Sequence, residues 1–579
     1  MIYVNSQVRS LSWEHLSRMF TLQKGANFQP IRILSYAIDY YFWKLNPVGY
    51  HITNILFYIL TCVMVFLTLR HLSASLRENA SPDSHERVAL FGSLIFAAHP
   101  VHVEAVTWLA ARKEVLQGFF FFLAFYLYLK VREQAGQKKI FYLGMVLFAI
   151  ILSILSKPSA IVFPAVILIY EIAREKNGWA DFARRHWPFF VISIVISVIF
   201  ISILFKGMLE AGGIKPYHGG SFFNNLLISS YVFLYNVKLL LFTINYSAAY
   251  TIPVSDPVLS IKTLVYVTIV SLFLALSFWS LKKTRVLFFS LLFFFVTLLP
   301  YLNIIPISTL LADRYVFISS FSYCFLLGIG FDRVYNYRNV HFSEGFFKLL
   351  SIALLVFLLG GYSFMTIKQN RLWENSYTLW ADAVEKYPNS NTANALMGVV
   401  YMGMGMDEKA SEFLERALKI LPYDYHSRNN LGIVYERLGQ PDKAVQELMT
   451  AIWLKPEDDK IKINLSTFYQ RQREYAKAQD VLQHLLSKAP NDANLHFRLG
   501  IVYKESGQYE AAVRELTKSM ELAPHIINPY EELGNIYASR LMDREKAKYY
   551  YTKGIEAMRR NKLGSEDLRW MVQDLENSR

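Results

Sequence analysis

A proline recurs every 34 residues through the C-terminal part of the chain. The prolines are Pro388, Pro422, Pro456, Pro490 and Pro524, and tyrosines keep the same spacing at Tyr401, Tyr435, Tyr469, Tyr503 and Tyr537. A small residue shares the phase in every copy, at Gly398, Gly432, Ser466, Gly500 and Gly534. Small residues let paired helices approach closely, and proline ends a helix because it cannot continue the hydrogen-bond ladder. A fixed period of this length therefore predicts stacked helical hairpins.

This period is that of tetratricopeptide repeats. The second helix of successive copies is marked by Ala410, Ala444, Ala478 and Ala512. We expect an α-solenoid over residues 370–579, in which 380–388 form the second helix of an incomplete first repeat and 566–577 a terminal cap. A solenoid exposes an extended concave groove that suits a protein or peptide, and a spacer with no ligand is the alternative.

Before residue 370 the chain is a succession of apolar runs. Hydrophobic residues make up 53% of the whole sequence, which is too many for a protein that is soluble throughout. A membrane crossing needs roughly 20 apolar residues. Candidate crossings lie at 49–69, 88–98, 115–130, 140–156, 159–173, 187–206, 261–281, 286–303, 315–331 and 347–366. The sequence therefore predicts about ten transmembrane helices, several of them short or broken.

The basic residues of the loops predict the orientation of these crossings. Lys and Arg are concentrated in the loops 70–87, 130–139, 174–185, 282–285 and 333–348, whereas the other loops hold only Arg112, Lys113, Lys157, Lys206, Lys215 and Arg314. By the positive-inside rule the first set is cytoplasmic, provided that 224–243, which Asn and Lys residues interrupt, is interfacial or re-entrant. Residues 1–48 and the repeats then lie outside the cytoplasm, so a further span is expected before Met1.

The predicted fold class is all-α, with an extracytoplasmic segment at 1–48, a polytopic transmembrane helix bundle at 49–369 and the repeat domain at 370–579. The net charge of +14 is explained by the loop cations, so a nucleic-acid partner is not expected. Cys62 and Cys324 lie far apart inside apolar runs, which excludes a disulfide framework and a zinc cluster.

Ionisable residues gather at the outer ends of the predicted crossings. The set comprises Asp39, His99, His102, Glu104, Arg112, Lys113, Lys157, Asp313 and Arg314. Charged residues at the membrane boundary often belong to a functional site. The alternative is that the histidines simply lie at the interface and that the cations extend their side chains to the membrane surface. Glu104 can serve as a general base, a metal ligand or a solvated carboxylate, and Lys157 and Arg314 can bind a lipid phosphate. No P-loop, H-E-x-x-H or post-strand G-x-G-x-x-G is present, which favours a donor delivered through lipid over a nucleotide.

Several stretches resemble the transmembrane and tetratricopeptide repeat-containing proteins, relatives of protein O-mannosyltransferases. They are NFQPIRILSYAIDYYFWKLNPVGYHITNILFY, FAAHPVHVEAVTWLAARKEVL, LSKPSAIVFPAVILIYE and ADRY, followed by the repeats. The resemblance covers nearly the whole chain and implies a bundle similar to the GT-C class of glycosyltransferases, which pass a sugar from a polyprenyl-phosphate carrier to an extracytoplasmic acceptor. Animal members are expected to O-mannosylate proteins. For a compact, bacterial-looking member the sugar and acceptor stay open.

The resemblance and the outer charges together predict three groups of site residues. Glu104, Asp313 and Asp39 are expected to be catalytic, Lys157, Arg314 and Arg32 to bind the donor phosphate, and His99, His102, Arg112 and Lys113 to bind the acceptor or support the site. The family carries an acidic pair after its first span, and residues 2–11 resemble the stretch that follows it. Either the pair lies upstream of Met1, which is the preferred explanation, or this form lacks its base. No metal site and no cofactor is predicted, a divalent metal being the alternative.

The main alternative to an enzyme is a non-catalytic membrane-anchored scaffold whose repeats recruit partners. A transporter is disfavoured because the two halves of the bundle show no repeated hydropathy. The predicted partners are a polyprenyl-phosphate-linked sugar, an extracytoplasmic protein or peptide, and the membrane. The predicted location is a bacterial inner membrane, which the chain crosses several times, with the repeats on the non-cytoplasmic side.

Overall fold

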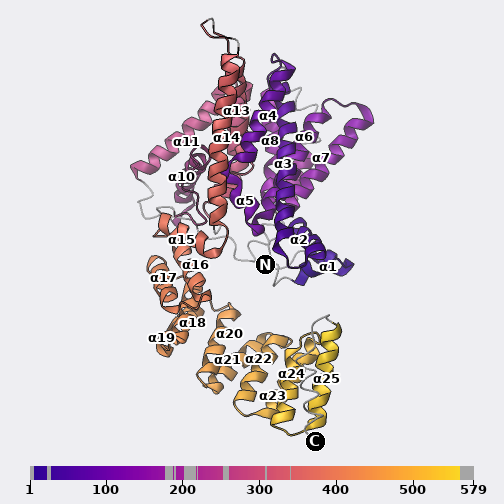
Figure 1. Cartoon of the computed structure of the whole chain (residues 1–579), viewed down its shortest axis with the longest axis vertical. Coiled ribbons are helices and arrows are strands. Elements are labelled where there is room, and N and C mark those ends of the chain that lie inside the picture. Colours follow the sequence, from indigo (N-terminus) through magenta and orange to yellow (C-terminus); the bar gives the residue numbers. More distant parts are fainter. Residues whose placement is uncertain are drawn as a thin grey trace. The chain divides into compact units, whose positions relative to one another are not determined.

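The computed structural model describes residues 6–21, 28–175, 191–200, 220–251, 260–306, 309–339, 341–343 and 345–560, with residues 187, 202 and 217. All regular elements in this part of the chain are helices, which confirms the all-α prediction there. The chain divides into two compact units, Met1–Pro388 and Asn389–Arg579 (Figure 1). The predicted cap at 566–577 lies outside the described residues, as do the loop residues 176–185, Lys206 and Lys215.

The first unit is a bundle of helices joined by short 3₁₀ turns. Its helices are α1 (Trp13–Met19), α2 (Pro30–Trp43), α3 (Pro47–Leu76), α4 (Pro82–Ala98), α5 (Val103–Thr107), α6 (Arg112–Val131), α7 (Gly136–Ser156), α8 (Phe163–Arg174), α10 (Phe222–Leu241), α11 (Ile261–Ser280), α12 (Arg285–Leu298), α13 (Ser320–Tyr335), α14 (Phe346–Leu372) and α15 (Ser376–Lys386). The 3₁₀ turns include η2 (Pro100–His102), η3 (Leu109–Ala111), η4 (Pro158–Val162), η6 (Leu299–Tyr301) and η7 (Asp313–Val316). Residues 380–388, predicted to be helical, fall largely on α15, which groups with this first unit.

Five described helices are long and apolar enough to cross a membrane: α3, α6 extended back to Leu109, α7, α11 and α14. A sixth candidate joins α4 to Pro100–Thr107 across a 52° bend. Prolines interrupt two of the other predicted crossings: Pro158 and Pro164 divide 159–173 into η4 and α8, and α12 in 286–303 ends before Pro300 of η6. The chain is therefore a membrane protein, and its described residues form fewer long spans than the ten apolar runs that the sequence predicted.

The predicted segments 187–206 and 224–243 are not among the five long apolar helices of the described residues. The run 187–206 is described only at residues 187, 191–200 and 202. The run 224–243 coincides with α10, a helix of 20 residues that buries Asn225 and Asn236. Its placement as an interfacial or re-entrant segment stays a prediction.

The core of the first unit is rich in aromatic side chains, and two glycines allow its helices to pack tightly. Phe96 and Phe122 pack edge to face, and Phe122 contacts Phe321 of α13. A Cβ atom added at Gly328 of α13 would lie 2.7 Å from the carbonyl oxygen of Val88 in α4 and 3.1 Å from the nitrogen of Gly92. Only glycine permits this approach, so α4 and α13 form a close pair, and η2 follows α4 directly.

The helices of the bundle have two distinct ends. At one end, which we call the site end, α5 contacts η7 and the start of α6, and α2 contacts α6 and α7. From there α6 runs to the opposite end, where the α6–α7 loop lies, and α7 returns to the site end at Lys157. The opposite end holds the α3–α4 loop and the end of α13 (Figure 1).

The second unit is the predicted repeat array. Its helices are α16 (Asn391–Gly403), α17 (Asp407–Ile420), α18 (Tyr425–Arg437), α19 (Pro441–Leu454), α20 (Asp459–Arg471), α21 (Tyr475–Lys488), α22 (Ala493–Glu505), α23 (Tyr509–Leu522), α24 (Asn528–Ser539) and α25 (Arg544–Arg560). The marker alanines from Ala410 to Ala512 are fully buried. Asp424, Asp458 and Asp492 cap first helices by accepting backbone N–H bonds, which accounts for the acidic residue two places after Pro422, Pro456 and Pro490.

Gly432→Ala is expected to loosen the second repeat. Its Cβ would lie 2.8 Å from Leu448 Cγ and 3.1 Å from the Ala444 carbonyl oxygen, and such overpacking costs about 1–3 kcal/mol. Amide hydrogen exchange in α18 and α19 should show a matching fall in the opening free energy. Gly403→Ala is the control because nothing lies within 4 Å of its Cβ. Equal protection in both variants would contradict close packing at Gly432.

Candidate functional site

Four buried charged side chains form a continuous ionic cluster at the site end. They are Glu104 of α5, Glu114 of α6, Lys157 after α7 and Arg314 of η7. The Arg314 guanidinium pairs with Glu104, whose Oε2 also accepts the backbone N–H of Arg314 at 3.0 Å. Arg314 Nε lies 4.0 Å from Glu114 Oε1, and Glu114 in turn pairs with Lys157. The structure thus brings together three residues that the sequence analysis selected from separate outer segments.

Lys157 is held firmly inside this cluster. Its Nζ donates to both oxygens of Glu114, at 2.8 and 2.6 Å, and to the Tyr301 hydroxyl at 2.6 Å. Burial lowers the pKa of Lys157, while the neighbouring Glu114 carboxylate opposes that shift. The Tyr301 ring stacks on Tyr315 at a centroid distance of 4.5 Å. Because its three donors already have partners, Lys157 is less available to a ligand than the sequence analysis assumed.

Glu114 is the central carboxylate of the cluster, and the sequence analysis missed it. Its side chain is 2% exposed. In the sequence it follows Arg112 and Lys113 at the start of an apolar helix, where an acidic residue is ordinary first-turn chemistry. The signal that could have identified it is its position at the boundary of the predicted span 115–130, because a carboxylate at the edge of the membrane needs a partner.

Asp313 precedes Arg314 and is also buried. The Tyr250 hydroxyl donates to its carboxyl group. Burial raises the pKa of Asp313 well above its usual range, the Glu104 carboxylate raises it further, and the Tyr250 hydrogen bond and Arg314 lower it less. Asp313 therefore has an increased affinity for a proton, whereas the carboxylate of Glu104 is ion-paired with Arg314.

Asp39 and Arg112 form a second, separate cluster at the same end. Arg112 is fully buried, and its Nη1 lies 2.5 Å from Asp39 Oδ2. Arg112 also donates to Asn54 Oδ1 and the Tyr50 carbonyl, both at 2.7 Å, and its guanidinium lies over the Tyr36 ring. Thr53 donates to the other Asp39 oxygen at 2.7 Å. This cluster ties α2 and α3 to the start of α6, so the arrangement around Asp39 suits a supporting role better than the catalytic role predicted for it.

His99 and His102 are buried in neutral hydrogen-bond networks. His102 lies 2.9 Å from the Tyr58 hydroxyl through Nδ1 and 2.9 Å from Ser320 Oγ through Nε2. His99 Nε2 lies 3.1 Å from the Leu240 carbonyl, and its Nδ1 accepts the Val101 N–H at 3.2 Å. Both rings join the turn before α5 to other helices, which matches the supporting alternative given for them.

Among the described residues, Arg32 and Lys113 are cations near the cluster that form no ion pair. Arg32 of α2 is buried, and its Nε makes no hydrogen bond within the described residues. Burial lowers the pKa of Arg32, while Glu114 acts in the opposite direction. Lys113 of α6 is partly buried and interacts electrostatically with Glu114, Lys157, Arg32 and Arg314. Four cations thus face the carboxylates of Glu104 and Glu114, which leaves excess positive charge for an anion.

A metal site was not predicted from the sequence. Among the described residues, no group of three or more His, Cys, Asp or Glu side chains could hold a metal ion. The carboxylates of the site end are instead engaged by Arg314, Lys157 and Arg112. The cations at the site end can bind an anion, and the carboxyl groups there can accept or release a proton.

Comparisons with known proteins connect both units to one group of relatives. The human protein O-mannosyl-transferase TMTC3 is 22% identical over 438 residues, covering 70% of this chain and 46% of that protein. The Caenorhabditis elegans protein O-mannosyl-transferase F38B6.6 is 23% identical, covering 68% of this chain and 54% of its own length. Human TMTC4 is 31% identical over a shorter stretch, 22% of this chain and 18% of that protein. These matches confirm the resemblance inferred from the sequence, and the chain spans about half the length of the curated relatives it matches.

The repeats match separately. The family described as "Psidin, N-terminal TPR repeats region" matches residues 376–497, and the family described as "Tetratricopeptide repeat" matches residues 469–526. Among solved structures, MamA from Desulfovibrio magneticus RS-1 is 23% identical, covering 29% of this chain and 95% of that chain with a TM-score of 0.27. YrrB, described as a TPR protein with an unusual peptide-binding site, is 20% identical, covering 32% of this chain and 98% of that chain with a TM-score of 0.25.

Proposed function

We propose that this chain is a membrane glycosyltransferase that transfers a sugar from a polyprenyl-phosphate carrier to a hydroxyl group of a protein on the non-cytoplasmic face. The observation that carries the proposal is the excess of cations over ionised carboxylates at the site end, including the buried Arg32 and the partly buried Lys113. The relatives are named protein O-mannosyl-transferases, which supports a protein acceptor and favours mannose as the sugar.

The reaction is a single displacement. The acceptor oxygen attacks the anomeric carbon, the bond between that carbon and the phosphate oxygen breaks, and the polyprenyl phosphate leaves with both electrons of that bond. Cations in a partly dry site stabilise the charge that develops on the leaving group. Arg32 and Lys113 hold the phosphate, and Arg314, oriented by Glu104, stabilises the leaving charge.

The acceptor hydroxyl must also lose a proton. We assign this proton to Asp313, because burial raises the pKa of its carboxyl group, and a carboxylate with a raised pKa binds a proton more readily than an ordinary one. Lys157 and Glu114 keep the cluster in place, and Asp39, Arg112, His99 and His102 support the helices around it. The repeats would then bind the acceptor polypeptide along their concave face.

Arg32→Gln and Lys113→Gln should each raise the donor KM by about tenfold or more, because a charge-assisted hydrogen bond to phosphate is worth about 1.5–3 kcal/mol. The assay uses the purified chain, polyprenyl-phosphate mannose and a secreted acceptor protein. Lys44→Gln is the matched control because Lys44 is exposed at the end of α2.

Two results would count against this function. If no polyprenyl-phosphate sugar supports transfer by a folded, inserted protein, the scaffold alternative is favoured. If the Arg32 and Lys113 variants behave like the Lys44 variant, the enzyme holds its donor phosphate elsewhere.

A further inference from the structure

The opposite end of the bundle carries an open cavity of about 1000 Å³. It is formed by the α3–α4 loop, the start of α4 and of α12, and the end of α13. Its charged lining consists of Arg77, Arg285, Arg333, Arg338, Glu78 and Asp332. The charges of these six side chains sum to +2. This volume is that of a site for a small molecule or a lipid headgroup.

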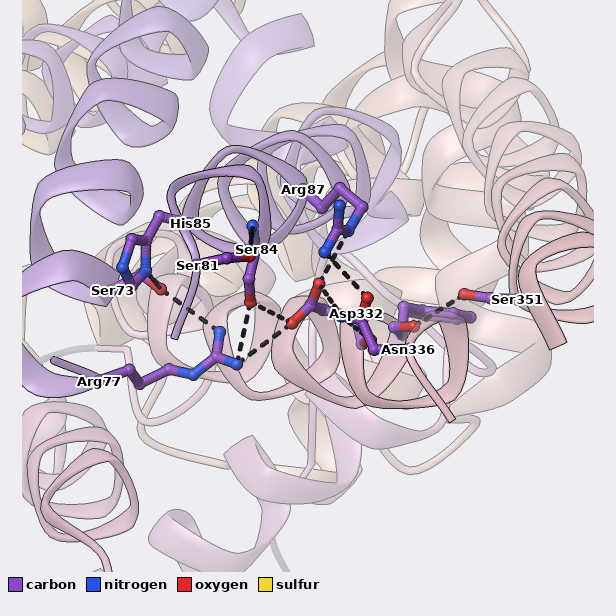
Figure 2. A network of polar contacts seen from close by, with 10 residues as sticks. Ser73, Arg77, Ser81, Ser84, His85, Arg87, Asp332, Asn336 and Ser351 are labelled. Atoms are coloured by element: carbon purple, nitrogen blue, oxygen red, sulfur yellow. Dashed lines mark hydrogen bonds and ion pairs between the residues drawn. The ribbon is translucent and has the colours of Figure 1, made fainter. Parts of the chain in front are cut away.

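Asp332 lies in one wall of this cavity, and its two carboxylate oxygens accept hydrogen bonds from four side chains. Arg77 Nη2 and Arg87 Nε donate to its two oxygens at 3.1 and 2.9 Å (Figure 2). Ser84 Oγ donates to Asp332 Oδ2 at 2.5 Å, and Asn336 Nδ2 donates to Oδ1 at 2.9 Å. The carboxylate is 1% exposed, so it is neutralised within the wall and fixes Arg77 at the cavity edge.

The remaining arginines of the cavity are not neutralised in this way. Arg333 and Arg338 are exposed and make no ion pair among the described residues. Arg285 donates from Nη1 to the Arg174 carbonyl oxygen at 3.2 Å and forms no ion pair within the part of the chain that the structure describes. Guanidinium groups present paired N–H donors that match the oxygens of a phosphate group.

We propose that this cavity binds a phosphate group, as found on an anionic phospholipid headgroup or a soluble phosphate ester. The site is separate from the proposed donor site, because α4 and α13 each run from this cavity to the site end of the bundle. Basic pockets at the cytoplasmic ends of transmembrane helices suit anionic headgroups. The positive-inside rule accounts for basic loops, but it does not require three uncompensated arginines to line one cavity.

Arg333→Gln with Arg338→Gln should weaken binding of phosphatidylglycerol by about tenfold or more, since each cation near a lipid phosphate contributes about 1 kcal/mol. Native mass spectrometry of the full chain, titrated with phosphatidylglycerol in neutral detergent, measures the affinity. The matched control is Lys138→Gln with Lys139→Gln, which removes the same charge from exposed positions at the start of α7, outside the cavity.

The proposal is overturned if neutral phosphatidylcholine binds as tightly as phosphatidylglycerol, if the arginine double variant stays within about twofold of the unmodified protein, or if both double variants weaken binding equally. A competition with inorganic phosphate then identifies the source of the ligand. Displacement of the lipid indicates that a soluble phosphate can occupy the cavity, and retention indicates that the phosphate must arrive on a lipid.

Discussion

Asp313→Asn is expected to lower sugar transfer by about 100-fold or more, because a positioned general base contributes roughly 10²–10⁴-fold to proton transfer. Asparagine keeps the size of the side chain and a hydrogen bond to Tyr250 but cannot accept the proton. The donor KM should change little, because the phosphate is bound by Arg32 and Lys113. The measurement is kcat for transfer from polyprenyl-phosphate mannose, with the donor saturating.

The pH profile gives an independent test of the same role. Burial raises the pKa of Asp313, and only the deprotonated carboxylate accepts a proton, so transfer should rise with pH through that raised pKa. The Asn variant should lose this rise. Glu171→Gln is the matched control: Glu171 is another fully buried carboxylate, which pairs with Arg132 toward the opposite end. If Asp313→Asn keeps transfer within about twofold while the pH profile is unchanged, a different group removes the proton.

Arg112→Met is expected to destabilise the site end by about 3–5 kcal/mol, the usual cost of leaving a buried charge without its partner. The change removes the ion pair with Asp39 and the hydrogen bonds to Asn54 and the Tyr50 carbonyl. Hydrogen exchange in detergent should show lower protection of α2 and of the first turns of α6, with α13 and α14 unaffected.

A double variant of Asp39 and Arg112 distinguishes the effect of losing their ion pair from the effect of losing the packing of the Arg112 side chain. Asp39→Asn combined with Arg112→Met removes the unpaired carboxylate, so part of the protection in α2 should return. If the double variant loses as much hydrogen-exchange protection as the two single variants lose together, Asp39 and Arg112 do not stabilise each other. Full protection in Arg112→Met alone would show that this cluster does not stabilise the site end.

The periodic and compositional features of the chain were predictable without coordinates. The 34-residue period specifies helix pairs whose small residues face each other, so Gly432 and Ala444 could be placed at a helix contact from spacing alone. The apolar runs identified the membrane unit for the same reason, because a backbone in lipid must satisfy its own hydrogen bonds as helix. Both are local rules that act within a few tens of residues.

Ion pairing was decided by the tertiary structure. Sequence reasoning assembled Glu104, Lys157 and Arg314 at one face, but it could not show that Lys157 is held by Glu114 or that Arg314 is held by Glu104. Those pairs join residues 43 and 210 positions apart, and their geometry depends on where η7 lies against α5. Proline breaks also shortened the runs 159–173 and 286–303, which composition alone had predicted to be full crossings. Hydropathy and periodicity are properties of a segment, whereas the charge balance at a buried site depends on which distant segments the fold brings together.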